Sequence, residues 1–391
     1  MSGLRAAMGA LAVLFAGCAP LNFLYQSPPN PVPPVFASTP DGWKIALYRY
    51  APTHVVASND PVILCHGNAL NNYFWHLEDP RDFGRYLQRR GFDVWLVDLR
   101  GHGASRLVNP FAGNYLGDQV AKHDPYNWSL EDYAMRDIDA VIGEVLKRTG
   151  KSRVNWIGHS MGGMIMYLRL GYAGDDRVAN FIAVSSPMDV PRPPSDMIEE
   201  MATNPDANMQ AVIEKRMMAS ILHNLAILKT VLMTPLDVLY YNRDCMPDET
   251  VIRFYANAVE NIPPKVNDQL MAMSVKGHLM SVNGEIDYAR LLSNVKTPIL
   301  CVTGKADELA PPEAVRYAFN SVSSADKTFH VFSRASNCPR DYGHCDIICG
   351  MGADKDVYPY LCKWLISRSG RRAPPASRPA SAPAPASRSA D

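Results

Sequence analysis

Short apolar segments that alternate with helix-forming ones between residues 36 and 190 constrain the fold of this chain most strongly. Five apolar segments are rich in β-branched and aromatic residues, as strands buried on both faces are. They are WKIALYRYA (43–51), PVILCHG (61–67), FDVWLVDLRGHG (92–103), RVNWIGHS (153–160) and VANFIAVSSP (178–187). Helix-forming segments at 80–91 and 129–150 lie between them. This alternation predicts an α/β fold with a doubly wound, mostly parallel sheet.

The alternation stops between residues 192 and 290, where the sequence is helix-forming and holds ten of the chain's 18 methionines. It resumes at TPILCVTGKAD (297–307) and KTFHVFS (327–333). We interpret residues 192–290 as a helical cap inserted between two parts of one core, at 36–191 and 291–368. Methionine adapts to irregular apolar shapes, so the cap either closes over varied acyl chains or has a Met-rich core of its own, and both can hold.

The N-terminal sequence MSGLRAAMGALAVLFAGCAP has the layout of a secretory signal over residues 1–18. Arg5 precedes an apolar run too short to span a membrane, and small residues follow before Cys18. LFAGC resembles a bacterial lipobox, in which the cysteine is lipidated, although Phe15 is unusual there; an ordinary cleaved signal peptide is the alternative. We therefore expect an exported protein, a periplasmic or outer-membrane lipoprotein of a bacterium.

Both flanks of the predicted core have biased composition. Residues 19–35 are rich in proline and predict a semi-rigid spacer that holds the domain off a membrane. Residues 369–391 are rich in proline, alanine and serine, which predicts a disordered tail. The formal net charge is zero and no basic stripe occurs, which argues against a nucleic-acid partner.

Eight cysteines fit an exported protein. Cys65 and Cys301 lie in apolar strand segments and should be buried thiols. The others are Cys18, Cys245, Cys338, Cys345, Cys349 and Cys362, and the last four are crowded near the C-terminus. In an oxidising compartment that crowding suggests one or two disulfides, with the pairing left open. No paired C-x-x-C or H-E-x-x-H spacing supports zinc, so we expect no metal and no other cofactor.

The segment VNWIGHSMGGMIMY (154–167) contains G-x-S-x-G between a predicted strand and a predicted helix. In α/β-hydrolases this motif is a strained turn that presents a serine hydroxyl above the end of the sheet. Because glycine and serine are common, the motif alone is weak, and Ser160 could be a small residue in a tight loop. Its context must decide between these interpretations.

A serine nucleophile needs a base and an acid, which in this fold follow it in the order Ser, Asp or Glu, His. Asp307 stands just beyond a predicted strand, where the carboxyl ends of parallel strands build ligand sites. Glu308 is the neighbouring alternative. His344 lies in the loop after the last predicted strand and is the only one of ten histidines beyond it. We predict Ser160, Asp307 and His344 as the catalytic triad.

The oxyanion of an acyl-transfer intermediate needs two preorganised backbone N–H donors. We expect one from Met161, directly after the nucleophile, and one from Asn68, in the loop that Gly67 lets turn inward. His66 should be a scaffold residue beneath that loop, because the mechanism requires no second base.

These segments also resemble the acid lipases of the gastric and lysosomal type. The resemblance covers residues 61–110 and 125–170, through HGNALNNYFW, GFDVWLVDLRGHGASR and NWSLEDYAMRDIDAVIGEVLKRTGKSRVNWIGHSMGG. GKADELAPPEAV and DYGHCDIICGMGADKDVYPYL are similar to that family's acid and histidine segments. It implies an α/β-hydrolase that cleaves lipid esters with Ser160, Asp307 and His344.

Three departures limit what carries over. Met161 stands where those lipases have glutamine, Asn68 replaces an apolar residue, and the cap shows no clear match. Ester hydrolysis therefore carries over, whereas triacylglycerol specificity does not. Polyhydroxyalkanoate synthases resemble the same core but use an elbow cysteine, and epoxide hydrolases and dehalogenases would want an aspartate there. An acyltransferase or polymer-handling enzyme with the same triad is the alternative, followed by a non-catalytic binding lipoprotein.

Overall fold

A computed structural model of the chain describes residues 24–56, 59–107, 126–189, 218–224, 226–230 and 235–370. Cys18, the signal segment and the tail beyond residue 370 lie outside the described residues, as do residues 190–217. Statements about the structure below concern the described ranges.

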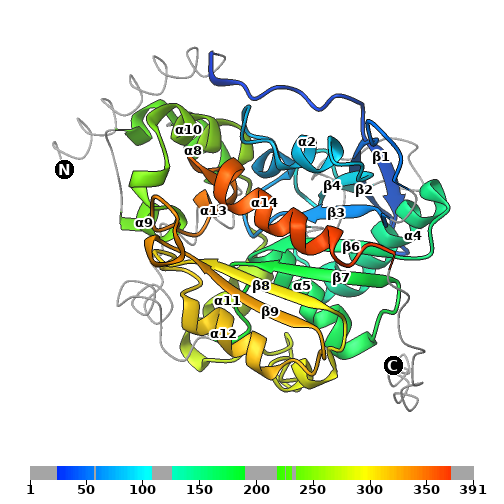
Figure 1. Ribbon diagram of the computed structural model, residues 1–391. Coiled ribbons are helices and arrows are strands. Elements are labelled where there is room, and N and C mark those ends of the chain that lie inside the picture. The colour runs from blue at the N-terminus through cyan, green and yellow to red at the C-terminus, as the bar shows by residue number, and fades with distance from the viewer. Residues whose placement is uncertain are drawn as a thin grey trace.

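One sheet forms the centre of the structure, with strand order β1-β2-β4-β3-β6-β7-β8-β9 and β5 added beside β2 (Figure 1). From β4 to β9 all neighbours are parallel, while β2 is antiparallel to β1, β4 and β5. The strands are β1 (Val35–Ser38), β2 (Trp43–Tyr50), β3 (Val62–Cys65), β4 (Val94–Asp98), β5 (Arg106–Leu107), β6 (Val154–His159), β7 (Val178–Val184), β8 (Ile299–Gly304) and β9 (Lys327–Phe332). This is the predicted α/β-hydrolase fold, and every strand predicted from the sequence is present.

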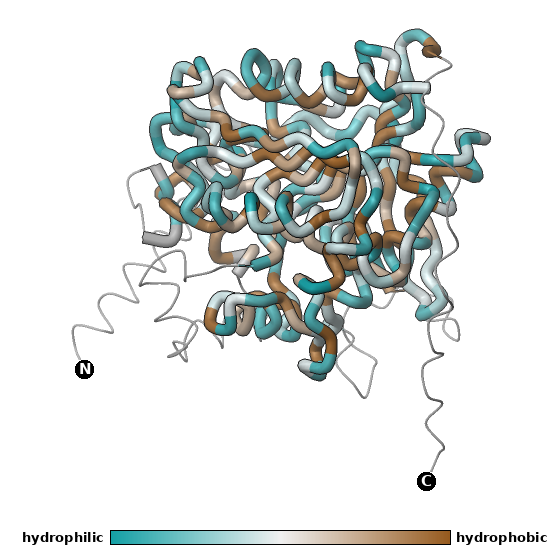
Figure 2. Tube along the Cα trace, turned by 60° about the horizontal axis from the view of Figure 1, so that its bottom comes forward, coloured by the Kyte–Doolittle hydropathy of each residue, from teal (hydrophilic) through white to brown (hydrophobic). Residues whose placement is uncertain are grey.

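Helices lie on both faces of this sheet. They include α2 (Phe83–Gln88), α4 (Ile138–Thr149), α5 (Met161–Leu168), α12 (Pro312–Ser321) and α14 (Ala353–Ile366). Alternate strand residues feed two separate cores: Ile63 and Trp156 pack with α4, α5 and α12, whereas Leu64 and Ile157 pack with α2 and α14. Figure 1 shows α14 running across the sheet, and in Figure 2 the hydrophobic segments concentrate inside the molecule. Burial on both faces explains the continuous apolar runs of the strands.

The helical segment predicted at 129–150 begins and ends where the sequence signals place it. It comprises α3 (Leu130–Asp132), the π-helical turn η3 (Tyr133–Asp137) and α4. Ser129 and Asp132 form a capping box, which satisfies N–H groups that the first turn leaves unpaired. Gly150, at φ 66°, ends α4 in the left-handed region that glycine adopts without steric cost.

The described residues between β7 and β8 are largely helical. They form α8 (Met218–Asn224), η5 (Ala226–Thr230), α9 (Pro235–Tyr240), η6 (Arg243–Cys245), α10 (Asp248–Arg253), η7 (Phe254–Ala258), α11 (Pro264–Lys276) and η8 (Arg290–Asn294). We call residues 218–294 the inserted segment. The remaining short elements are η2 (Asn72–Trp75), η4 (Arg169–Ala173), η9 (Arg334–Ser336) and α13 (Asp346–Cys349).

Part of the proline-rich spacer lies against the body of the protein. The Asn257 side chain accepts a bond from the N–H of Ser27 and donates one to the carbonyl of Tyr25. Ser27 Oγ donates to Leu77 O at 2.7 Å, and Asn30 Nδ2 donates to Asn72 Oδ1 at 2.9 Å. The part of the predicted semi-rigid spacer from Tyr25 to Asn30 is therefore held to the body by hydrogen bonds.

The disulfide prediction is wrong for the described cysteines, all of which are free thiols. Cys345 and Cys349 lie about one helical turn apart, and Cys349 Sγ donates to Cys345 O instead of bonding to another sulfur. Cys362 belongs to α14 and is buried in the core that this helix covers, and Cys338 packs against the same core while partly exposed. Cys65 and Cys301 are fully buried thiols, as predicted. Within the described ranges no helix is long and apolar enough to cross a membrane.

Candidate active site

Ser160 occupies a strained turn between β6 and α5. Its backbone has φ 50° and ψ −120°, and a non-glycine residue adopts such a positive φ only where its surroundings hold it. The flanking glycines permit the turn: a Cβ on Gly158 would lie 2.3 Å from Gly162 O, and one on Gly162 would lie 2.4 Å from Cys65 O. Helix and strand thus approach closely, and Ser160 is left partly exposed at the sheet edge.

Asp307 and His344 form a buried pair in the loops that follow β8 and β9. His344 Nδ1 lies 3.0 Å from both carboxylate oxygens of Asp307. Asp307 Oδ1 also accepts the N–H groups of Leu309 and Ala310, at 3.1 and 2.7 Å. Since the carboxylate accepts, Nδ1 of His344 donates to it, and Nε2 takes no part in this contact. The alternative acid, Glu308, is exposed.

His159 connects the serine turn to the histidine loop. Its Nε2 lies 2.9 Å from the backbone carbonyl of His344, which can only accept, so Nε2 is protonated. The two rings are also close, with centroids 4.8 Å apart. Burial and the neighbouring His344 lower the pKa of His159 well below its usual range, so the ring is a neutral donor. Within the described residues Ser160 Oγ itself makes no hydrogen bond to His344.

The loop after β3 lies directly beside Ser160. A Cβ on Gly67 would be 2.8 Å from His159 Nδ1 and 3.1 Å from Ser160 Cβ, so only glycine fits there. Ala69 has a positive φ of 57°, which turns the chain sharply after Asn68. Among the described residues, the N–H groups of Asn68 and Met161 have no hydrogen-bond acceptor.

His66 is used as a scaffold. Its Nδ1 donates to Gly67 O at 2.8 Å, and its Nε2 accepts the N–H of Leu99 at 3.1 Å. Burial, followed by the nearby His102, lowers the pKa of His66 well below its usual range. With both nitrogens occupied, this ring has none free to act as a base.

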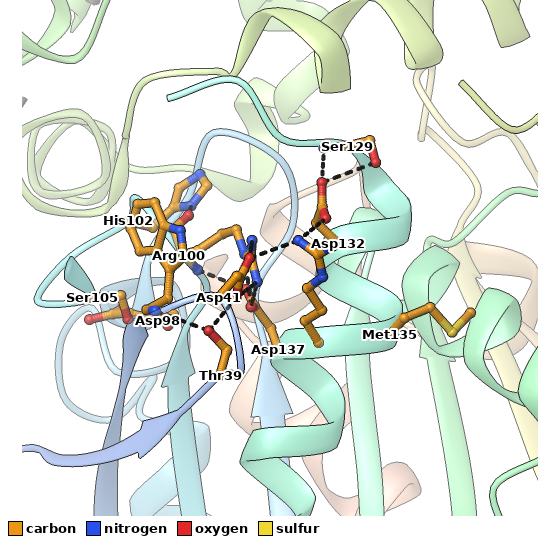
Figure 3. Close-up of polar contacts among 12 residues, drawn as sticks. Thr39, Asp41, Asp98, Arg100, His102, Ser105, Ser129, Asp132, Met135 and Asp137 are labelled. Carbon is orange, nitrogen blue, oxygen red and sulfur yellow. Dashed lines mark hydrogen bonds and ion pairs between the residues drawn. The ribbon is translucent and has the colours of Figure 1, made fainter. Parts of the chain in front are cut away.

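A buried ion-pair network holds the loop after β4 (Figure 3). Arg100 contacts Asp137 of η3 at 2.6 Å and Asp41 of the β1–β2 turn at 2.8 Å. Burial opposes ionisation of Asp41, but hydrogen bonds from Arg100 and Thr39 outweigh it and lower its pKa to about 2. These bonds fix the loop at the edge of the sheet where Ser160 and the β3 loop meet.

Asp346 holds the loop that carries His344. Its two carboxylate oxygens accept the N–H groups of Gly343 and Asn242, at 2.7 and 2.8 Å. Burial raises the pKa of Asp346 to about 7, although these two bonds act in the opposite direction. Cys345 N donates to Tyr240 O at 2.8 Å in the same place. The histidine loop is therefore held by the inserted segment.

Sequence reasoning missed two supporting residues of this site. His159 stands directly before the predicted nucleophile, and Asp346 stands two residues after the predicted base, so proximity in sequence could have drawn attention to both. Neither residue belongs to a sequence motif from which its hydrogen-bond partner could be predicted. In the described ranges no three histidine, cysteine, aspartate or glutamate side chains cluster in a way that could hold a metal ion.

A family model described as alpha/beta hydrolase fold matches residues 60–339. The chain belongs to the α/β hydrolase fold family. This α/β hydrolase is 23% identical over 360 residues to triacylglycerol lipase 1 of Arabidopsis thaliana, across 84% of this chain and 86% of that one. It is also 24% identical over 342 residues to the poly(3-hydroxyalkanoate) polymerase subunit PhaC of Thiocystis violacea, across 83% and 86%.

A solved thermophilic esterase from Thermogutta terrifontis has the same fold as this α/β hydrolase. Its TM-score is 0.52 at 20% identity, and the superposition covers 86% of this chain and 100% of the esterase. At that identity the likeness concerns the fold alone. The relatives together support a lipase- or esterase-like hydrolase.

Proposed function

We propose that this α/β hydrolase cleaves carboxylic esters, lipid or other acyl esters, through an acyl-enzyme on Ser160. The observation that carries the proposal is the buried Asp307–His344 pair, with Nδ1 of the histidine 3.0 Å from both carboxylate oxygens. This arrangement leaves Nε2 as a base at the sheet edge where the strained turn presents Ser160. The resemblance to acid lipases and the similarity to a plant triacylglycerol lipase support this substrate class.

In the proposed reaction Ser160 Oγ attacks the ester carbonyl as His344 Nε2 takes its proton. Asp307 stabilises the resulting imidazolium, and the N–H groups of Asn68 and Met161 hold the oxyanion. His344 then returns the proton to the departing alcohol, which leaves an acyl-Ser160. A water molecule, deprotonated by the same histidine, releases the acid and restores the serine. Catalytic hydrogen bonds are often long before substrate binds, which accommodates the unmade Ser160–His344 bond.

Transfer of the acyl group to an alcohol or to a growing polyester is the second candidate, favoured by the similarity to a poly(3-hydroxyalkanoate) polymerase subunit. Both candidates share the acyl-enzyme and differ in what attacks it. A serine at the elbow, where the resemblance gives polyhydroxyalkanoate synthases a cysteine, makes hydrolysis the preferred function.

We also propose that the protein is exported and lipidated at Cys18, on the basis of the signal-like segment and the lipobox resemblance. The same enzyme would then act on esters at or near a bacterial membrane.

Labelling with a fluorophosphonate probe, together with a series of p-nitrophenyl esters from acetate to palmitate, tests the enzymatic proposal. We expect the probe to modify Ser160, and Ser160→Ala to lose labelling and at least about a thousandfold of turnover while it still folds. Ser152→Ala, at an exposed serine, is the control. Turnover by Ser160→Ala within tenfold of the wild type would exclude the mechanism. Added alcohol, with product analysis, separates hydrolysis from acyl transfer.

A further inference from the structure

The loop that carries Asn68 is paired with a piece of the inserted segment far away in sequence. Asn71 N donates to Ala258 O at 3.0 Å, and Glu260 N donates to Ala69 O at 2.8 Å. Leu70 and Val259 form an antiparallel bridge between these two bonds. The backbone that must present the Asn68 N–H is therefore held by residues 258–260.

The Glu260 side chain extends this pairing to a third loop. Its Oε1 accepts from Asn71 Nδ2 at 2.9 Å and from Gly103 N at 3.1 Å. Asn71 Nδ2 also donates to Asn257 O at 2.9 Å. One carboxyl oxygen thus links the loop after β3 to the loop after β4.

The loop after β4 is itself held in place by hydrogen bonds and ion pairs. Asp98 Oδ2 accepts Ala104 N at 3.0 Å, and Arg100 is fixed by the ion pairs of Figure 3. Asp98 Oδ1 accepts both the N–H and the side-chain amide of Asn72, at 2.8 and 2.9 Å. The β3 loop is therefore bound to the β4 loop by Asp98 at Asn72 and by Glu260 at Asn71.

We propose that Glu260 is a positioning residue that holds the Gly67–Asn71 loop so that the Asn68 N–H points at the oxyanion. The inference rests on the proposed function for its catalytic consequence. The hydrogen bonds of the Glu260 side chain go to Asn71 and Gly103 and not to Ser160, Asp307 or His344, so we assign it a positioning role and not a catalytic one. Its effect on rate would come through the placement of Asn68, since displacement of a catalytic group by about 1 Å can cost about a hundredfold.

Two substitutions at Glu260 can separate the loss of the accepting oxygen from the loss of the charge. Both bonds end on Oε1, and burial raises the pKa of Glu260 to about 7 despite the opposing bonds from Asn71 and Gly103. A single oxygen accepts from both donors. Glu260→Gln keeps that oxygen, whereas Glu260→Ala removes it.

The first measurement is amide hydrogen exchange across residues 66–72, which does not depend on any activity. We expect Glu260→Ala to raise exchange there at least about tenfold, and Glu260→Gln to stay within about threefold of the wild type. Glu285→Ala, at an exposed glutamate of the inserted segment, is the matched control and should not change exchange. Unchanged exchange in Glu260→Ala, or equal behaviour of the Gln and Ala variants, would overturn the proposal.

The second measurement is steady-state hydrolysis of a p-nitrophenyl ester. Glu260→Ala should lower kcat by about ten- to a hundredfold with KM within about threefold, and Glu260→Gln should restore kcat. If Glu260→Ala fails to fold, Asn71→Ala takes its place. This variant removes the side-chain amide that donates to Glu260, and it should lower kcat by a similar factor. If the wild type cleaves esters through Ser160 and Glu260→Ala has the same kcat as the wild type, the positioning role of Glu260 is contradicted while the proposed function is not. A wild type without esterase activity contradicts the proposed function, and the exchange measurement still decides the loop's support.

Discussion

Nε2 of His159 donates a hydrogen bond to the main-chain carbonyl of His344, at 2.9 Å. The residue directly before the predicted nucleophile thereby holds the loop of the predicted base, in addition to the bonds that Asp346 and Asp307 make. His159 is buried and packs against Phe74, with ring centroids 4.4 Å apart. The serine turn and the histidine loop are thus positioned relative to each other by the protein, independently of any bond between Ser160 and His344.

Loss of this bond should reduce turnover more than it reduces binding. His159→Phe keeps an aromatic ring against Phe74 but has no N–H for the His344 carbonyl, so we expect kcat to fall by about ten- to a hundredfold with KM nearly unchanged. Steady-state kinetics on a p-nitrophenyl ester measures this, with His54→Phe at an exposed histidine as the control. An unchanged kcat in a folded His159→Phe variant would show that the bond does not position His344.

Two glycines offer a matched test of the serine turn. Gly162→Ala would place a Cβ 2.4 Å from a backbone carbonyl, so we expect a loss of about 1 to 3 kcal/mol in unfolding free energy, together with lost activity. Gly143, inside α4, has open space within 4 Å of the position that a Cβ would take, and Gly143→Ala should stabilise by up to about 1 kcal/mol. Denaturant unfolding of both variants checks the pair. Equal changes in unfolding free energy for the two variants would mean that the close approach of Gly162 to the Cys65 carbonyl does not require glycine.

Asp346 should make stability depend on pH in a defined direction. Its pKa rises on folding from the ordinary value of 3.8 to about 7, so its contribution is fully present below about pH 4 and is lost as the pH rises through 7. Asp346→Asn lacks this titration but loses an acceptor for one N–H. We expect the wild type to be the more stable by the largest margin near pH 5 and by a smaller margin at pH 8. Thermal unfolding of both proteins from pH 5 to pH 8 measures the margin; a constant margin contradicts the prediction.

Lipidation at Cys18 predicts where the protein is found in a Gram-negative host. Several acyl chains on one residue anchor a protein stably, and Ala19 in place of aspartate favours the outer membrane. Labelling with an alkyne fatty acid should mark the wild type in the membrane fraction, and Cys18→Ser should abolish the label. A mature protein that lacks residue 18 and is free in the medium would contradict lipidation.

Local pattern was enough to predict the sheet, because strands buried on both faces leave continuous apolar runs. Chain order and position after β8 and β9 were enough to place Asp307 and His344 together. The supports of the site were not predictable in this way: Glu260 meets Asn71 and Gly103, and Asp346 meets Asn242, across more than a hundred residues. Such pairs depend on how the inserted segment packs, which leaves no periodic signal. The disulfide prediction failed because crowding in sequence does not bring sulfurs together: α13 and α14 bury Cys349 and Cys362 in an apolar core, while Cys338 stays partly exposed.

The bonded stretch from Tyr25 to Asn30 changes the reach of the proposed anchor. With the spacer free through residue 35, seventeen residues would separate a lipid on Cys18 from the folded body. With Tyr25 already bound to the Asn257 side chain, only residues 19–24 are left, and six extended residues span at most about 20 Å. An anchored molecule would then be confined to a thin layer at the bilayer surface, with the side that carries Asn257 and Leu77 turned towards the lipid.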